Sequence, residues 1–116
     1  MKYLDTERKF DLIITIVNRG FADDVMNAAR SAGAHGGTIL CARGSGIHET
    51  AKFFGISIQP EKELILILVR REEKREIMQA IGREAGLTKE GQGLSFSLPV
   101  DDVVGIVHMM KEIENK

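Results

Sequence analysis

The chain has 116 residues and a mass of 12.8 kDa, which fits one domain spanning residues 1–116. Its 43% hydrophobic and 28% charged residues are typical of a globular domain and exclude a disordered one. A net charge of −1 disfavours a nucleic-acid partner, and the single cysteine excludes an intramolecular disulfide. Because no apolar run approaches about 20 residues and residues 1–9 do not resemble a signal peptide, we expect a cytoplasmic protein that is not embedded in a membrane.

The first half of the chain predicts a strand, a helix and a second strand. Residues 12–17 are mostly β-branched and end in the turn-forming residues 18–20. Residues 21–32 place apolar side chains at helical spacing, and Gly33 ends this helix. Residues 37–42 then form the second predicted strand.

The second half repeats this order after a long connection. Residues 64–69 are almost uniformly aliphatic and predict a strand, and residues 72–85 predict a helix. Residues 94–98 alternate strictly between apolar and polar and predict a fourth strand. We expect residues 99–102 to turn the chain, with Asp101 and Asp102 capping an apolar segment that ends in a helical tail.

Two strand–helix–strand halves predict an α+β, ferredoxin-like βαββαβ sandwich, in which two helices cover one face of a four-stranded antiparallel sheet. Strands one and three are central in that fold, and strand four lies at an edge. The sequence agrees, because residues 12–17 and 64–69 are apolar on both faces whereas Ser95 and Ser97 interrupt residues 94–98.

Two helices leave the other face of such a sheet uncovered. Either Leu12 or Ile13, and either Ile65 or Leu66, must then point to that face. A monomer would expose several large aliphatic side chains in one patch, so we predict a homo-oligomer. The alternative is that residues 103–113 fold back over the patch.

Few residues suggest catalysis or metal binding. The three histidines, His35, His48 and His108, lack the spacing of a metal site, and Cys41 is predicted to be a buried, inert thiol. Since no acid and base pair accompanies a nucleophile, we predict neither an enzyme nor a metal centre.

Two glycine clusters suggest instead a site for an anion. Residues 43–46 (Arg-Gly-Ser-Gly) follow the second strand, and residues 86–93 join the second helix to the fourth strand. Glycines let backbone amides approach an anion closely. Residues 43–60 form a connection longer than most unstructured loops, and its basic, aromatic and hydroxyl side chains suit a loop that contacts a partner or is ordered by a ligand.

The two clusters resemble those of PII signalling proteins. Residues 33–46 are similar to the segment that runs from the first helix into the T-loop, and residues 86–96 to the B-loop and fourth strand. The similarity continues through residues 99–104 and covers about residues 10–106 in the same element order. It implies a T-loop at 43–60, a B-loop at 86–93, an N-terminal extension at 1–9 and a C-terminal tail at 107–116.

The resemblance further implies a ferredoxin-like homotrimer with an adenine nucleotide (ATP, ADP or AMP) in clefts between subunits. Thr38, Gly44 and Gly46 would line the nucleotide at the base of the T-loop. The backbone amides of Gly91, Gln92 and Gly93 would face phosphates. Lys62 matches a lysine of the family that arranges the loop or 2-oxoglutarate.

The chain departs from the family at positively charged positions. Leu94 stands where the family has a lysine, and Gly105 and Val107 stand where it has two arginines that reach phosphates. Charge-assisted contacts are the strong ones, so Arg43, Lys89 or Arg83 would have to replace them. The loop glutamine that helps hold magnesium has no match, so we do not expect a magnesium requirement. Tyr3 is the only tyrosine, so the loop tyrosine that the family modifies is absent.

The sequence therefore predicts a PII-like regulator of signal transduction, not an enzyme. It would bind a small anionic effector and regulate a partner enzyme or membrane transporter through residues 43–60, with nitrogen metabolism as the family's setting. The candidate binding residues are Thr38, Arg43, Gly44, Gly46, Lys62, Lys89, Gly91, Gln92 and Gly93. Two alternatives stay open, a CutA-like metal-responsive trimer that uses His35, His48 and Cys41, and a ferredoxin-like oligomerisation domain without a nucleotide.

Overall fold

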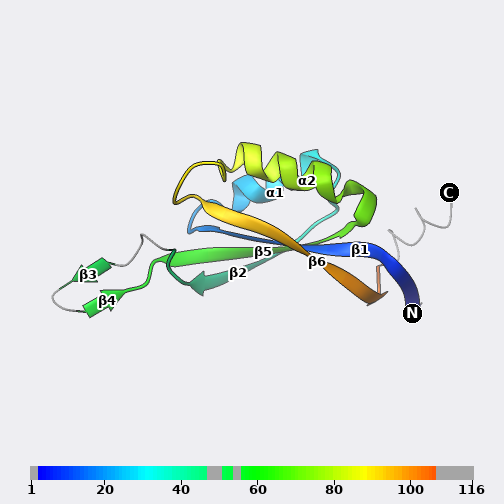
Figure 1. The fold of residues 1–116 in the computed structure, drawn as a ribbon, viewed down its shortest axis with the longest axis horizontal. Coiled ribbons are helices and arrows are strands. Elements are labelled where there is room, and N and C mark those ends of the chain that lie inside the picture. The colour runs from blue at the N-terminus through cyan, green and yellow to red at the C-terminus, as the bar shows by residue number, and fades with distance from the viewer. Residues whose placement is uncertain (1–2, 47–50, 54–55, 107–116) are drawn as a thin grey trace.

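Two helices lie on one face of a four-stranded antiparallel sheet in the computed structural model, which describes residues 3–46, 51–53 and 56–106 (Figure 1). The strand order is β2-β5-β1-β6, so β1 and β5 are central and β6 is an edge. The ferredoxin-like prediction is confirmed. The elements are β1 (Tyr3–Asn18), α1 (Ala22–Ser31), β2 (Thr38–Arg43), β3 (Ala51–Phe53), β4 (Ile56–Ile58), β5 (Glu61–Arg70), α2 (Arg71–Glu84) and β6 (Gly93–Val104).

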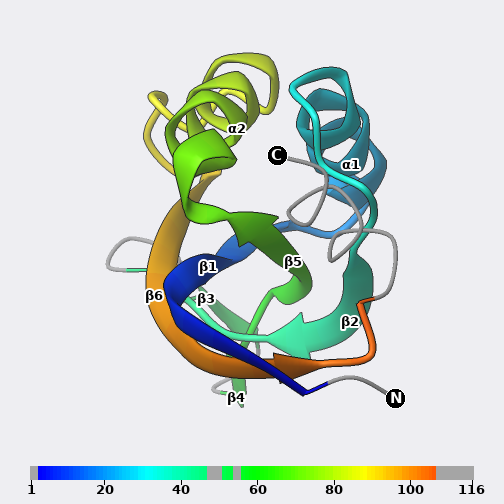
Figure 2. The same ribbon diagram turned by 90° about the vertical axis from the view of Figure 1, so that its right-hand side faces the viewer.

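The core forms between the helices and one face of the sheet. Figure 2 shows α1 above the β2 side of the sheet and α2 above the β6 side. The predicted helical faces are buried, with Val25 and Met26 on α1 and Ile77 and Ile81 on α2. They pack in one cluster with buried β-strand residues, among them Ile13, Ile65 and Ile67.

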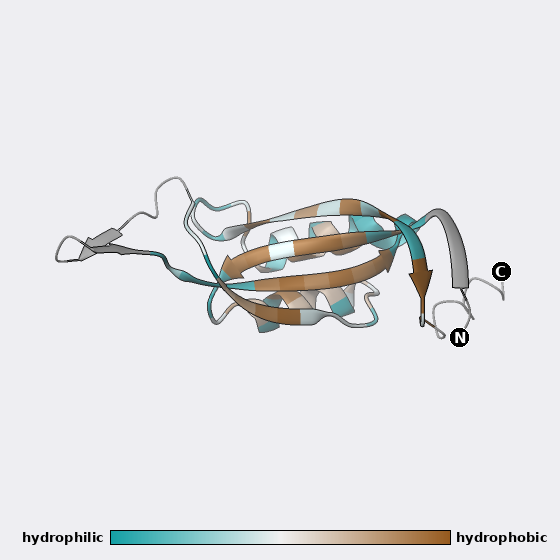
Figure 3. Ribbon diagram, turned by 90° about the horizontal axis from the view of Figure 1, so that it is seen from below, coloured by the Kyte–Doolittle hydropathy of each residue, from teal (hydrophilic) through white to brown (hydrophobic). Residues whose placement is uncertain are grey.

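The opposite face of the sheet, here called the open face, is apolar and has no helix over it within the described residues (Figure 3). The strand register aligns its side chains in rows across β6, β1 and β5, because side chains alternate between faces. These rows are Leu94–Ile16–Leu64, Phe96–Ile14–Leu66 and Leu98–Leu12–Leu68. Of the alternatives left open by the sequence, Leu12 and Leu66 therefore belong to the open face, while Ile13 and Ile65 are fully buried.

The predicted turn at residues 99–102 is wrong, because β6 continues through it to Val104. Pro99 is tolerated since β6 is an edge strand that pairs with β1 alone among the described strands, and a proline at an edge need not donate to a neighbour. Asp101 and Asp102 accordingly lie in a strand and do not cap a helix. Strand β1 is also longer than expected and begins at Tyr3, with an irregular register between Asp5 and Phe10.

The connection between β2 and β5 contains a short hairpin that the sequence did not reveal. Strands β3 and β4 pair with each other in a separate sheet, and Figure 1 shows this hairpin projecting from one end of the main sheet. His48 and the tail at 107–116, including His108, lie outside the described residues.

A buried carboxylate ties the start of α2 to the sheet. Asp11 is 1% exposed, and its carboxylate accepts hydrogen bonds from Arg71 Nη2 at 3.0 Å and Nε at 3.3 Å. Lys74 Nζ lies 3.3 Å from the same carboxylate. Burial by itself raises the pKa of Asp11, but the hydrogen bonds and charges of the two cations outweigh burial and hold the pKa below its ordinary value.

In the described part of the chain, neither helix is long and apolar enough to cross a lipid bilayer.

Candidate functional site

Residues 43–60, which the resemblance predicts to be the T-loop, are here called the T-loop segment, and backbone pairing closes the root of this segment. Ala42 lies opposite Lys62 and Arg43 opposite Glu61 where β2 meets β5. Beyond this pair, the Gly44 N–H donates to the Pro60 carbonyl oxygen at 3.2 Å. This pairing holds the glycines of the first cluster next to the start of β5.

A cavity of about 240 Å³ opens at this root, on the open face. It brings together five of the nine predicted binding residues: Arg43, Gly44, Gly46, Lys62 and Gly93. Its remaining walls come from Ile16, Ala42, Ser45, Leu64 and Leu94. The arrangement combines two cationic residues, glycine backbone and an apolar floor, which suits an anion that carries an apolar group.

Lys62 connects the cavity to the second glycine cluster. The residue is only 9% exposed, and its Nζ donates to Asn18 Oδ1 at 2.6 Å. Asn18 Nδ2 in turn donates to the carbonyl oxygen of Gly91 at 3.0 Å. Asn18 was not predicted as a site residue. Its position could be inferred from the sequence only through the strand register, which pairs the last residue of β1 with Lys62.

Residues 86–93, which the resemblance predicts to be the B-loop, are here called the B-loop segment, and three of their glycines have positive φ values. Gly86, Gly91 and Gly93 have φ values of 70°, 80° and 136°, and a Cβ on Gly93 would lie 2.2 Å from the Ile16 carbonyl oxygen. The Gln92 N–H donates within the turn to the Lys89 carbonyl oxygen at 3.4 Å.

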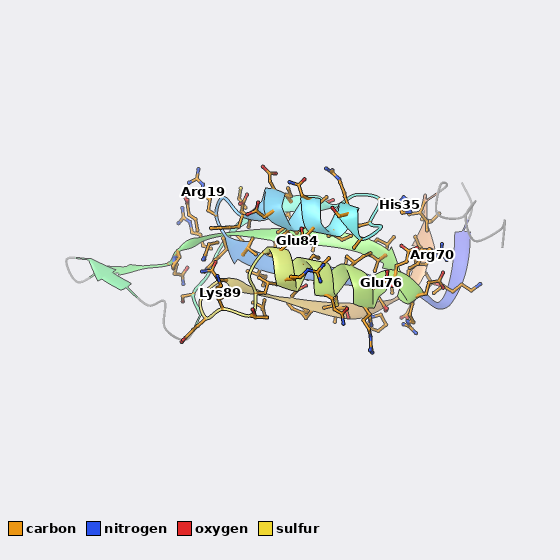
Figure 4. All side chains as sticks on the ribbon, turned by 90° about the horizontal axis from the view of Figure 1, so that it is seen from above. Arg19, His35, Arg70, Glu76, Glu84 and Lys89 are labelled. Atoms are coloured by element: carbon orange, nitrogen blue, oxygen red, sulfur yellow. The ribbon has the colours of Figure 1, made fainter. Side chains whose placement is uncertain are left out.

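Two other predicted residues lie apart from the cavity. Figure 4 shows Lys89 and Arg19 at the end of the sheet from which the β3–β4 hairpin projects, whereas His35 lies at the far end. Thr38 is near His35 and lines a second cavity of about 380 Å³, together with Leu66, Leu68 and residues of neighbouring elements. The two cavities are close along β5, since Leu64 lines one and Leu66 the other.

Arg83, one of the cations expected to compensate for Leu94, does not line the loop-root cavity of its own chain. Leu94 is 52% exposed and forms an apolar wall of the cavity at the loop root. Arg83 is exposed on α2 and lines a cavity between the helices, with Ser31 and Glu76 among its neighbours. Among the residues that the structure describes, Arg43 and Lys62 are the cations that line the loop-root cavity.

A further cavity lies at the β2 edge beside the same root, and charged residues are prominent among those that line it: Arg19, Cys41, Glu61, Glu63 and three others. The prediction that Cys41 is buried is wrong, because its thiol is exposed. Strand β2 is an edge strand with most of its residues exposed, so an apolar strand pattern there does not lead to burial. A hydrogen bond and the charge of Glu61 raise the pKa of Arg19.

Metal-binding groups do not gather in the described residues. Among them, no group of three or more histidine, cysteine, aspartate or glutamate side chains could hold a metal ion. His48 lies outside these residues, so its predicted part in a metal-responsive alternative stays untested.

The ferredoxin-like fold and the cavity at the root of residues 43–60 agree with the resemblance to PII proteins noted in the sequence. The model of the family "Nitrogen regulatory protein P-II" matches residues 10–108, and the chain therefore belongs to this family. A crystal structure of Arabidopsis thaliana PII bound to citrate is similar, with a TM-score of 0.65 and 25% identity over 85% of this chain and 82% of that chain. A comparison with curated proteins found no significant match. The chain is accordingly a signal-transduction regulator and not an enzyme, as predicted.

Proposed function

We propose that this P-II family member is a cytoplasmic homotrimer that binds an adenine nucleotide in the clefts between subunits. The occupied site would control the T-loop segment, which would contact a regulated enzyme or transporter of nitrogen metabolism. The observation that carries this proposal is the cavity of about 240 Å³ at the loop root, where glycine backbone, Arg43 and Lys62 meet an apolar floor.

The open face supports self-association. Leu94, Phe96 and Leu98 on the edge strand β6 are 52%, 38% and 48% exposed, and they extend the aliphatic rows of β1 and β5. A monomer would leave this continuous patch in water, which costs about 25 cal/mol for each Å² of apolar surface. Packing of the open faces of three copies removes that cost and places the loop-root cavity beside a neighbouring subunit.

The shape of the site supports a nucleotide. The two cavities on the open face lie along β2, whose residues from Thr38 to Arg43 span about 16 Å at the rise of an extended strand. The cavity at the loop root is cationic at Arg43 and Lys62 and apolar along its floor, and the second cavity is lined in part by aliphatic side chains of β1 and β5. An adenine ring would lie on the apolar part, and the phosphates would face Arg43, Lys62 and the glycine amides.

The loop would report binding through its conformational equilibrium. An effector shifts such an equilibrium only if it binds one loop conformation more tightly than another. Lys62 and Gly44 belong both to the cavity and to the root of the T-loop segment, so an anion in the cavity has contacts that depend on the loop's position. The proposed partner would bind one of these loop conformations more tightly than the other.

Isothermal titration calorimetry tests the ligand, with separate titrations of ATP, ADP, AMP and citrate. Citrate is included because the Arabidopsis relative is a citrate complex. We expect binding of at least one adenine nucleotide and a loss of about tenfold or more in affinity for Lys62→Met, since a charge-assisted hydrogen bond contributes about 1.5–3 kcal/mol.

The matched control is Arg75→Met, which removes one positive charge from an exposed position on α2. It should bind the nucleotide as the wild type does. If citrate binds and no nucleotide does, the effector is a carboxylate and the nucleotide assignment is wrong. Binding of no ligand, together with no change in thermal stability, would refute the proposal.

A further inference from the structure

Asn18 bridges the two loops that frame the cavity. It is the last residue of β1 and lies opposite Lys62 in the antiparallel register. Its side-chain oxygen accepts a hydrogen bond from Lys62 Nζ at 2.6 Å, and its side-chain nitrogen donates one to the Gly91 carbonyl oxygen at 3.0 Å. One carboxamide thus joins the root of the T-loop segment to the B-loop segment.

The side chain at this position must accept one hydrogen bond and donate another at the same time. A carboxamide does both from adjacent atoms, whereas a carboxylate can only accept and an aliphatic side chain can do neither. Lys62 is largely buried, so the bond from its ammonium to Asn18 is partly shielded from water. The turn around Gly91 contains a long internal hydrogen bond, from the Gln92 N–H to the Lys89 carbonyl oxygen at 3.4 Å. The hydrogen bond from Asn18 to the Gly91 carbonyl oxygen therefore stabilises this turn from a neighbouring element.

We propose that Asn18 is a positioning residue that couples the two loops. A movement of the Lys62 ammonium toward an anion in the cavity withdraws a donor from Asn18, and the freed carboxamide releases the carbonyl of Gly91. The B-loop segment thereby responds to a change that begins at the T-loop root. The role of the anion rests on the proposed function, whereas the bridge rests on the two hydrogen bonds of Asn18.

Amide hydrogen exchange in the ligand-free protein tests the coupling. The readouts are the Lys89 and Gln92 amides, both of which are hydrogen-bonded within the B-loop segment. We expect Lys62→Met to accelerate their exchange about tenfold, the effect of losing one hydrogen bond to a charged group. Asn18→Leu should do the same, and the double variant should exchange no faster than Asn18→Leu alone.

Two further variants control for poor folding of Asn18→Leu and for a nonspecific effect of a substitution near Asn18. Asn18→Asp keeps the size of the side chain and the acceptor for Lys62 but loses the donor to Gly91, so it should also accelerate exchange even if Asn18→Leu folds poorly. Arg19→Gln alters the adjacent residue, which pairs with Glu61 on β5, and should leave both amides unchanged. Unchanged B-loop exchange in Lys62→Met, or additive effects in the double variant, would overturn the proposal.

A parallel titration with ATP shows whether a failure concerns the coupling through Asn18 or the proposed nucleotide binding. If the wild type binds no ATP but the exchange pattern holds, the coupling stands and the nucleotide assignment fails. If the wild type binds ATP and Lys62→Met leaves the Lys89 and Gln92 amides unchanged, the nucleotide assignment stands and the coupling fails.

Discussion

Replacing Leu98 by glutamate tests the packing of the open face. Leu98 is 48% exposed in the single chain, so about half of its burial remains to be gained in an oligomer, which is worth about 1 kcal/mol. A carboxylate buried in the same place costs several kcal/mol more, because it would lack a partner among aliphatic neighbours. With three copies affected, we expect Leu98→Glu to weaken trimer assembly by at least about a thousandfold.

Sedimentation velocity at micromolar concentration measures this change. The wild type should sediment as a trimer and Leu98→Glu as a monomer, with circular dichroism confirming that the variant is folded. Gln79→Glu places the same charge on an exposed position of α2 and should remain trimeric. A folded Leu98→Glu variant that sediments with the wild type would refute the assignment of the open face to the subunit interface.

Two other predictions concern stability. Asp11 has a folded pKa below its unfolded value, so its ion pairs with Arg71 and a second cation stabilise the fold at pH values above the unfolded pKa of about 3.9. This contribution should fall as the pH drops through the folded pKa, and Asp11→Asn should flatten the acid limb of an unfolding titration; an unchanged limb would contradict the role. Gly93→Ala should lower stability by about 1–3 kcal/mol or more in thermal unfolding, because its φ is 136° and the new Cβ would meet the Ile16 carbonyl oxygen. Gly82→Ala, which adds a Cβ into open space within α2, should not destabilise, and equal effects of the two alanines would refute the argument.

The architecture could be predicted because the spacing of apolar residues along the chain indicates which side chains are buried. The alternation in residues 94–98 and the aliphatic runs in residues 12–17 and 64–69 identified the edge and the central strands. Thr15 and Ser95 explain part of this pattern, since their hydroxyls form a hydrogen bond at 2.9 Å on the helix-covered side of β1 and β6. The same alternation places the apolar residues of β6 on the open face.

Other features depend on which elements lie side by side, and local patterns do not determine this. Pro99 lies within a strand because β6 is an edge, and Cys41 is exposed because β2 is the other edge. The hairpin of β3 and β4 lies in a segment whose glycine and polar residues suggested an irregular loop.

The pairing of strands also decides which of the predicted site residues lie together. Arg43, Gly44 and Lys62 meet because β2 and β5 pair, as the predicted topology requires. Asn18 was missed since its position opposite Lys62 depends on a residue-by-residue register, and Thr38 lines the second cavity and not the one at the loop root. The roles of Thr38 and Lys89 stay predictions.

Native mass spectrometry with added ATP tests the central claim most directly, because one spectrum reports both assembly and occupancy. The account predicts a species of three times 12.8 kDa that carries up to three nucleotides. A single chain of 12.8 kDa at micromolar concentration, or a trimer that takes up no nucleotide at any ATP concentration, would contradict it.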